Sequence, residues 1–302
     1  MTGDDRWELA EELAEVGRAV RVAVGVPQGA ADAEVVRTEG GDDVFGVDAR
    51  ADEVLIAEIE HRCGSRWPGT LVIEGFDDPV PVGDAGGPWR YLADPVDGSR
   101  PWLWGKRSAW VLLGAGREAT TLEQLEVGAC VELPTPRAAV ALVAFAVAGD
   151  GPPRAVDDDI AGGPPRPAHL VPLSGDRLDH RFVTVLRYAI GTKATIGAWE
   201  DTVLAGLHVY EDPFISTGGL IMEVAAGRQA AVLDPRPMLI PTTPSSHPYD
   251  LAGLVVARQA GVLVEALPPG PLDVPLDTTT SVAWAAYANP AIAELLRARL
   301  PE

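Results

Sequence analysis

The spacing of apolar residues along the chain predicts a series of helices. In residues 7–24, apolar side chains recur every three or four positions, which is the period of an amphipathic helix. These side chains are Leu9, Leu13, Val16, Val20 and Val24. A second helix is expected to begin near Asp48, which is well placed to be its N-cap. Later helices are expected over residues 192–207, 216–227, 249–261 and 290–299.

Short apolar runs between these helices predict β-strands. The runs span residues 44–47, 70–75, 91–93, 108–114, 127–133, 140–147, 182–188, 230–234, 262–266 and 281–287. An aromatic loop is expected over residues 100–104, and a Gly-, Pro- and Asp-rich loop or flap over residues 149–167. No internal repeat is visible. Because strands and helices interleave along the whole chain, the sequence predicts a layered α/β or α+β fold.

The composition narrows the classes of partner. The 302 residues carry a formal net charge of −20, which disfavours nucleic acid and anionic membranes but permits divalent cations. Two cysteines, Cys63 and Cys130, are too few for a disulfide framework. The acidic segment Met1–Asp5 does not resemble a signal peptide, and no apolar run is long enough to span a membrane. We therefore expect a reduced, cytoplasmic protein with neither nucleic acid nor a membrane as its partner.

The clearest candidate chemistry lies at the end of the apolar run that begins at Tyr91. Asp94 and Asp97 stand three positions apart, with a proline that stiffens the turn between them. Carboxylates held close together repel each other unless a cation lies between them. Gly98 allows the backbone to approach a ligand without a Cβ clash, and the hydroxyl of Ser99 can cap the turn or orient a water. These residues predict a site for a hard metal ion and a phosphate.

Two further carboxylates lie in positions that could join this site. Glu74 ends an apolar run 20 residues before Asp94, and catalytic groups of layered α/β folds tend to gather at strand ends. Asp250 opens a predicted helix that ends at Gly261. For Asp48, a role as the N-cap of its helix explains the residue equally well.

Several motifs together resemble those of the inositol monophosphatase family and its relatives, the fructose-1,6-bisphosphatases and the lithium-sensitive nucleotide phosphatases. Asp94-Pro95-Val96-Asp97-Gly98-Ser99 is similar to the Asp-Pro-x-Asp-Gly-Ser/Thr signature of that family. The other similar elements are Val47-Asp48, Ile73-Glu74, Tyr249-Asp250-Leu251-Ala252-Gly253, Gln259-Ala260-Gly261-Val262 and Ala286-Tyr287-Ala288-Asn289-Pro290. The resemblance implies an α+β fold, layered as an α-β-α-β-α sandwich of the sugar phosphatase type. It also implies a single unit over residues 1–302, with approximate halves 1–180 and 181–302, that is often a homodimer.

The resemblance also implies roles for these residues. Glu74, Asp94 and the carbonyl of Val96 would hold one Mg²⁺, and Asp94, Asp97 and Asp250 a second, among two or three ions in all. All of these ligands are oxygens, which suits Mg²⁺ and not zinc. The phosphate would rest on backbone N–H groups around Gly98 and Ser99. Catalytic roles are implied for three residues, of which Ser99 and Asp48 would orient the attacking water and Glu74 would also be a metal ligand.

One assignment has an alternative in the sequence. Asp212, in Tyr210-Glu211-Asp212, could take the place of Asp250 as the downstream carboxylate. We prefer Asp250, because it opens an apolar helix that leads directly to a glycine turn and a strand. Asp212 is instead followed by Pro213, Phe214 and a separate helix.

Three departures from the family pattern bear on the substrate. Gly75 stands where the family usually has a second glutamate, and Arg100-Pro101-Trp102 replaces the usual small polar residues. Pro101 removes a backbone donor, while Arg100 could add a contact to the substrate phosphate. Asp234 lies roughly where the family has an acidic residue that contacts the substrate, but the loop after it is longer.

The resemblance therefore implies a Mg²⁺-dependent phosphomonoesterase that acts on a small polyol or sugar phosphate through two-metal activation of water. Two alternatives stay open on the sequence. One is a bisphosphatase of the fructose 1,6-bisphosphate or adenosine 3',5'-bisphosphate type. The other is a non-catalytic protein that binds a metal or a sugar phosphate.

Overall fold

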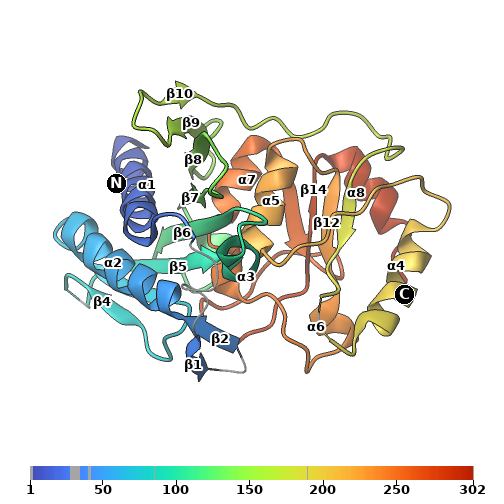
Figure 1. Cartoon of the computed structure of the whole chain (residues 1–302), viewed down its shortest axis with the longest axis horizontal. Helices are drawn as coiled ribbons and strands as arrows, with labels where there is room; N and C mark the ends of the chain where they lie inside the picture. Colours follow the sequence, from blue (N-terminus) through green and yellow to red (C-terminus); the bar gives the residue numbers. More distant parts are fainter. Residues whose placement is uncertain (1–2, 28–34, 40–41, 85, 189, 302) are drawn as a thin grey trace.

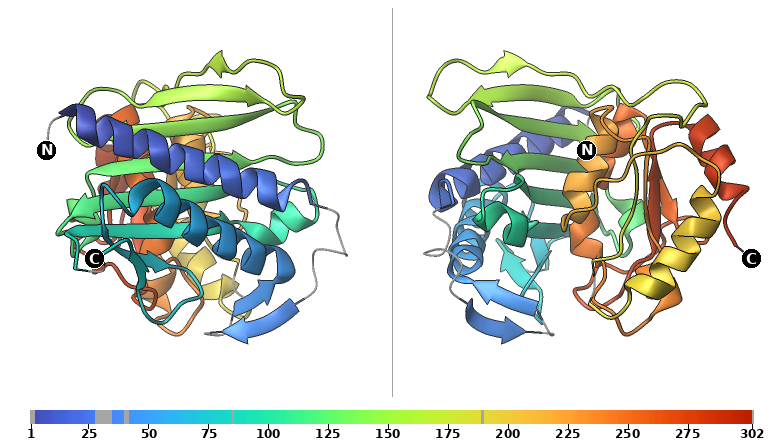
Figure 2. Two further views of the ribbon diagram at one scale, coloured as in Figure 1. Left: turned by 90° about the vertical axis from the view of Figure 1, so that its left-hand side faces the viewer. Right: turned by 45° about the vertical axis from the view of Figure 1, so that its right-hand side comes forward.

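In the computed structural model, which describes residues 3–27, 35–39, 42–84, 86–188 and 190–301, two β-sheets alternate with three layers of helices (Figure 1). One helical layer covers the outer face of the larger sheet, one lies between the sheets, and one covers the smaller sheet (Figure 1, Figure 2). This order confirms the predicted α-β-α-β-α sandwich. Among the described residues, no helix combines the length and the apolarity needed to cross a membrane.

The first helical layer consists of α1 (Gly3–Val24) and α2 (Gly46–Cys63). The apolar stripe predicted for α1 is buried along its whole length. A hairpin of β1 (Val35–Glu39) and β2 (Asp42–Phe45) precedes α2. Asp48 lies inside the first turn of α2, where its carboxylate accepts a hydrogen bond from Phe45 N at 2.9 Å. The prediction that Asp48 is the N-cap was therefore wrong, because Phe45 occupies that place.

The larger sheet has eight strands in the order β10-β9-β8-β7-β6-β5-β3-β4. They are β3 (Gly69–Ile73), β4 (Val80–Val82), β5 (Trp89–Asp97), β6 (Ala109–Arg117), β7 (Val127–Leu133), β8 (Val140–Val147), β9 (Arg154–Asp159) and β10 (Arg166–Pro167). Only β3 and β5 are parallel neighbours. The prediction of a loop or flap over residues 149–167 was wrong for the parts of it that form β9 and β10. Backbone pairing at a sheet edge tolerates charged side chains that give no strand pattern.

The smaller sheet has the order β11-β12-β14-β13 and packs against the middle helices (Figure 1). Its strands are β11 (Val183–Val185), β12 (Ala231–Asp234), β13 (Leu263–Ala266) and β14 (Trp284–Tyr287). The middle helices are α5 (Thr217–Ala225) and α7 (Leu254–Ala260), and the outer ones are α4 (Lys193–Leu204) and α8 (Pro290–Arg297). Apolar side chains from both sheets and from these helices form one continuous core.

Short helical segments connect these layers and change two of the expectations. They are α3 (Ser99–Leu103), α6 (Arg236–Leu239) and the 3₁₀ turns η2 (Leu122–Gln124) and η3 (Pro248–Leu251). The predicted aromatic loop is helical because Trp102 turns into the core, where its Nε1–H donates to the Pro134 carbonyl at 3.0 Å. The single helix predicted over residues 249–261 is divided into η3 and α7.

Close packing between α1 and β7 depends on a glycine. A Cβ atom at Gly17 would lie 2.5 Å from Cγ2 of Val131 and 2.8 Å from its Cβ. Val131 is fully buried in a densely packed core, so it has little room to move. The absence of a side chain at position 17 therefore sets the distance between the helix and the sheet.

Gly17→Ala should lower the free energy of unfolding by about 1 kcal/mol or more. Overpacking costs about 1–3 kcal/mol, which exceeds the gain of about 0.5–1 kcal/mol from better helix propensity. Gly197→Ala in α4 is the matched control, because a Cβ there would meet nothing within 4 Å. That control should gain about 0.5–1 kcal/mol. Equilibrium urea unfolding measures both, and shifts of the same sign would contradict the close packing.

Candidate metal centre

Glu74 and Asp94 are brought together by the parallel pairing of β3 and β5. Ile73 pairs with Ala93, and the backbone N–H of Glu74 continues the ladder to the Ala93 carbonyl at 3.2 Å. Residues that follow paired positions on parallel strands leave the sheet at the same edge. Burial raises the pKa of Asp94, and repulsion by the Glu74 carboxylate raises it further, because the two groups line the same cavity.

A β-bulge places Asp94 and Asp97 in the same cavity. On β6, Asp94 pairs with Leu112 and Asp97 with Trp110, so three steps along β5 match two along β6. In a regular strand, residues three apart point to opposite faces, and an extra residue corrects this alternation. The backbone N–H of Val96, inside the bulge, donates to Asp94 Oδ1 at 3.0 Å.

The beginning of α5 holds Asp97. Its carboxylate accepts hydrogen bonds from Ser216 Oγ at 2.6 Å, Thr217 N at 2.9 Å and Gly219 N at 2.9 Å. Gly98 makes this approach possible, because its φ of +87° and the 2.8 Å from a Cβ there to Ser216 Cβ both disfavour a side chain. Gly98, which follows the bulge, therefore allows β5 to lie close against the start of α5, a helix from a distant part of the sequence.

Asp250 completes a group of three carboxylates. Asp94, Asp97 and Asp250 each offer an oxygen within 4.8 Å of the others. The backbone N–H of His247 donates to Asp250 Oδ2 at 2.6 Å, which orients that carboxylate within η3. The alternative residue, Asp212, pairs with Arg107 and does not line this cavity. The structure thus brings Asp250, and not Asp212, to the other two.

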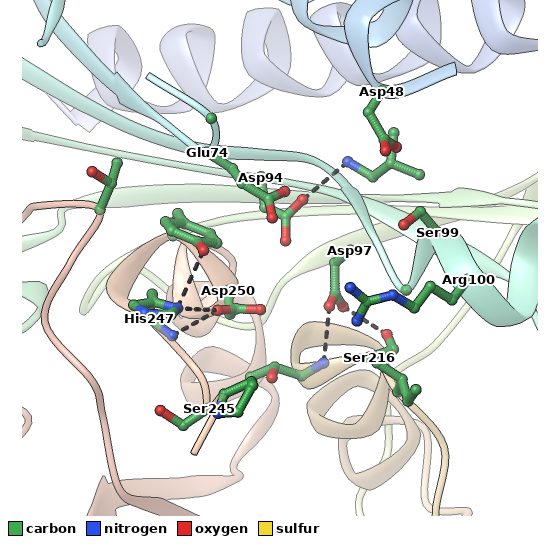
Figure 3. Close-up of a pocket in the computed structure, with 18 of the residues that line it drawn as sticks. Asp48, Glu74, Asp94, Asp97, Ser99, Arg100, Ser216, Ser245, His247 and Asp250 are labelled. Carbon is green, nitrogen blue, oxygen red and sulfur yellow. Dashed lines mark hydrogen bonds and ion pairs between the residues drawn. The ribbon is translucent and has the colours of Figure 1, made fainter. Parts of the chain in front are cut away.

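These residues line one cavity of about 380 Å³ (Figure 3). The site residues from the sequence that line it are Asp48, Glu74, Asp94, Val96, Asp97, Gly98, Ser99, Arg100 and Asp250. Gly75 lines it as well, where the motif comparison expected a glutamate.

Asp234 is the exception among the candidate residues. Its carboxylate is fully buried, does not line the cavity, and is bound by Arg236 and by Ser246 Oγ at 2.8 Å. Asp234 is therefore not among the lining residues, whereas Arg236, to which it is bound, is one of them. The contact of Asp234 with a substrate stays a prediction.

Other lining residues were missed by the sequence reasoning. Asp52 could have been found, because it lies one helical turn after Asp48 on the same face of α2. The remaining polar ones come from separate segments and carry no local signal. They are Asp77, Tyr188, Ser216, Thr217, Arg236, Ser245, His247, Tyr249, Thr278 and Thr279.

The carboxyl groups disfavour one another's ionisation. Loss of hydration raises the pKa of Glu74, Asp94 and Asp250 well above the usual range, and repulsion between neighbouring carboxylates raises it further. The pKa of Asp97 is also raised by burial, while the hydrogen bonds from the start of α5 oppose that rise. A divalent cation would remove the repulsion, and an all-oxygen set of carboxylates is what Mg²⁺ or Ca²⁺ prefers. The donor set therefore fits a hard divalent cation.

Of three comparisons with known proteins, only the one with solved structures finds similar proteins. No known family model matches the chain, and no curated protein matches it. Among solved structures, it is similar to extragenic suppressor protein suhB from Bartonella henselae, at 18% identity and a TM-score of 0.67, covering 98% of this chain and 97% of that one.

Two further solved structures are similar over nearly the whole chain. The MJ0109 gene product, an inositol monophosphatase-fructose 1,6 bisphosphatase, has 17% identity and a TM-score of 0.68, covering 99% of this chain and 100% of that one. The inositol monophosphatase of Anabaena (Nostoc) sp. has 16% identity and a TM-score of 0.62, covering 99% and 96%. The chain therefore has the fold of the inositol monophosphatase-like proteins, as its motifs predicted.

Proposed function

We propose that this chain is a Mg²⁺-dependent phosphatase that hydrolyses a small phosphorylated polyol or sugar. The observation that carries the proposal is the convergence of Glu74, Asp94, Asp97 and Asp250 on one cavity beside Ser99. Solved structures with this fold include an inositol monophosphatase and an inositol monophosphatase-fructose 1,6 bisphosphatase. Their names support a phosphate ester as the substrate.

The proposed metal ligands fall into two overlapping sets. Glu74, Asp94 and the carbonyl of Val96 would hold one Mg²⁺, and Asp94, Asp97 and Asp250 a second. When bound, the ions would neutralise the carboxylates and polarise the reacting phosphate and water. Asp94 belongs to both sets, and its hydrogen bond from Val96 N keeps its orientation fixed between them.

The residues that would position water and phosphate lie across the cavity from Asp250. Figure 3 shows Asp48 and Ser99 on that side. The bond from Phe45 N holds one oxygen of the Asp48 carboxylate, so its orientation is set before substrate binds. The Ser99 hydroxyl can hydrogen-bond the attacking water, and Asp48 can accept a proton from that hydroxyl or water. Backbone N–H groups around Gly98 would receive the phosphate.

The charge of the cavity makes a bound cation a condition for binding a phosphate ester. Among the described residues, seven carboxylates and two arginines line the cavity: Asp48, Asp52, Glu74, Asp77, Asp94, Asp97 and Asp250, with Arg100 and Arg236. A phosphate dianion brought among ionised carboxylates is repelled strongly, because the surroundings screen charge poorly. Turnover should therefore require a divalent cation.

The first test of this function is phosphate release from a panel of sugar and polyol phosphates with and without Mg²⁺. Asp94→Asn should lower Mg²⁺-dependent release at least about a hundredfold, because Asp94 is the carboxylate shared by both metal sets. Asp212→Asn, a change on the surface outside the cavity, should leave the rate unchanged. Full turnover by Asp94→Asn would sink the proposal. Mg²⁺ binding in calorimetry with no turnover on any substrate would indicate a non-catalytic binder instead.

The second test uses the pH dependence of stability without metal. Glu74, Asp94 and Asp250 have a raised pKa in the folded state, so they bind protons more readily there than in the unfolded chain. Each group stabilises the fold at pH values below its usual pKa of about 4. This stabilisation is lost as the pH rises through the raised pKa. In EDTA at pH 8, the melting temperature of Asp250→Asn should therefore exceed that of wild type, by about 2–4 °C for each kcal/mol of repulsion that the substitution removes. The difference should shrink toward pH 4.

Mg²⁺ should reverse this order, because its binding displaces the protons held by the carboxyl groups. We expect Mg²⁺ to raise the melting temperature of wild type more at pH 8 than at pH 5. The rise should be smaller for Asp250→Asn, which keeps only the set of Glu74, Asp94 and the Val96 carbonyl. Thermal melts at the two pH values, with Asp212→Asn as the control, measure both effects. An Mg²⁺ shift that is independent of pH would contradict this account of the carboxylates.

A further inference from the structure

Asp97 and Asp250 belong to segments that are far apart in the sequence, and each carboxylate is held by a backbone N–H group. Asp97 ends β5, and its Oδ1 accepts a hydrogen bond from Thr217 N, at the start of α5, at 2.9 Å. Asp250 lies in η3, and its Oδ2 accepts one from His247 N at 2.6 Å. Both carboxylates point into the same cavity, so their like charges push the two segments apart (Figure 3). A bond between the segments would oppose this repulsion.

The side chain of Ser246, the residue before His247, makes such a bond. The hydroxyl groups of Ser246 and Thr217 lie 2.8 Å apart and share a hydrogen bond. Thr217 holds Asp97 through its own amide, and Ser246 is covalently joined to the residue whose amide holds Asp250. α5 also packs against η3. The pair of hydroxyl groups therefore links the two amides that orient the carboxylates.

The other partners of Ser246 decide which of the two hydroxyl groups donates. A serine hydroxyl has one hydrogen and two lone pairs. Ser246 Oγ donates its hydrogen to Asp234 Oδ2 at 2.8 Å and accepts a hydrogen bond from Trp284 Nε1 at 3.0 Å. The remaining lone pair of Ser246 accepts, so Thr217 Oγ1 is the donor of the shared bond. Rotation of the Ser246 hydroxyl cannot reverse this direction without breaking the bond to Asp234.

A buried ion pair holds Ser246 in place. Asp234, which accepts from Ser246, is bound by Arg236 through Nε at 2.8 Å and through Nη2 at 2.7 Å. The contact from Arg236 Nη2 to Ser246 Oγ, at 3.4 Å, is weak in comparison. All the residues of this network are buried: Thr217, Asp234, Arg236, Ser246 and Trp284. Hydrogen bonds shielded from water are strong, so the ion pair should anchor Ser246 firmly.

We propose that Ser246 is a positioning residue for the metal centre. Its hydroxyl fixes the separation of Asp97 and Asp250 through the bond from Thr217. This role rests on the proposed function, in which both carboxylates are ligands of one Mg²⁺. Ser246 does not line the cavity, so it acts through other residues. Mg²⁺ needs near-ideal octahedral geometry, whereas Ca²⁺ accepts longer and more variable ligand distances. A fixed separation should therefore favour Mg²⁺ over Ca²⁺.

The test is calorimetric measurement of the affinities for Mg²⁺ and Ca²⁺, which do not depend on turnover. Thr217→Val removes the donor hydroxyl but keeps the shape of the side chain and the amide that holds Asp97. We expect it to weaken Mg²⁺ binding about tenfold or more, because loss of a residue that orients a metal ligand typically costs about 10–100-fold in affinity. Ca²⁺ binding should weaken less. Thr217→Ser, which keeps the hydroxyl, should bind Mg²⁺ as wild type does.

Two further variants separate positioning from a general effect on stability. Thr243→Val is the matched control, because the Thr243 hydroxyl is buried in the segment that carries Ser246 and has no partner among the described residues. This control should leave both affinities unchanged. Ser246→Ala breaks the shared bond from its other side. The double variant Thr217→Val/Ser246→Ala should therefore bind Mg²⁺ no more weakly than the weaker-binding single variant, and a product of the two single effects would contradict a shared bond.

Equal Mg²⁺ affinity of Thr217→Val, Thr243→Val and wild type would overturn this role of Ser246, and phosphate release by wild type would leave the phosphatase proposal intact. An equal loss of affinity for the two ions would also overturn the role, because general destabilisation gives that result. If wild type binds Mg²⁺ but releases no phosphate from any substrate, the proposed function fails, and the affinities still decide the role of Ser246. Absence of Mg²⁺ binding by wild type would overturn both.

Discussion

Repulsion between carboxylates that share a poorly hydrated cavity is the constraint on which this structure depends. Asp94, Asp97 and Asp250 lie within a few ångströms of one another, and Glu74 adjoins Asp94. Loss of hydration and mutual repulsion both raise the pKa values, so the group is favourable only with bound protons or a cation. At neutral pH, a divalent cation both relieves the repulsion and supplies the charge that a phosphate ester needs. Under the proposed function, stability and turnover would therefore depend on the same ion.

Three features of the fold hold the carboxylates together against this repulsion. The parallel register of β3 and β5 aligns Glu74 with Asp94, and the bulge in β5 turns Asp97 to the same side as Asp94. The start of α5 then donates hydrogen bonds to Asp97, which favours its ionised form where burial disfavours it. The register, the bulge and two of the three hydrogen bonds to Asp97 are made by the backbone, which resists the repulsion better than mobile side chains would.

The segment between β12 and Asp250 places a buried ion pair beside the cavity. Asp234, at the end of β12, binds Arg236, and Arg236 is the member of the pair that lines the cavity. The pair is neutral as a whole, so it can be buried, while its cationic member lines the cavity.

The sequence alone determined the layered fold, because helix and strand periods alternate clearly along it. It also determined the candidate residues of the Asp94–Ser99 motif, because closely spaced carboxylates with a glycine and a hydroxyl have few structural uses. It could not determine the start of α2 at Gly46, the strands within residues 149–167, or the division of the helix after Asp250. These depend on backbone pairing and packing between distant segments, which leave no periodic pattern. Only the tertiary structure decided that Ser216 binds Asp97, 119 residues away, and that Asp234 turns from the cavity toward Arg236. The physical reason is that a local pattern records which side chains are apolar, whereas the partner of a buried charge is set by which segments the fold brings together.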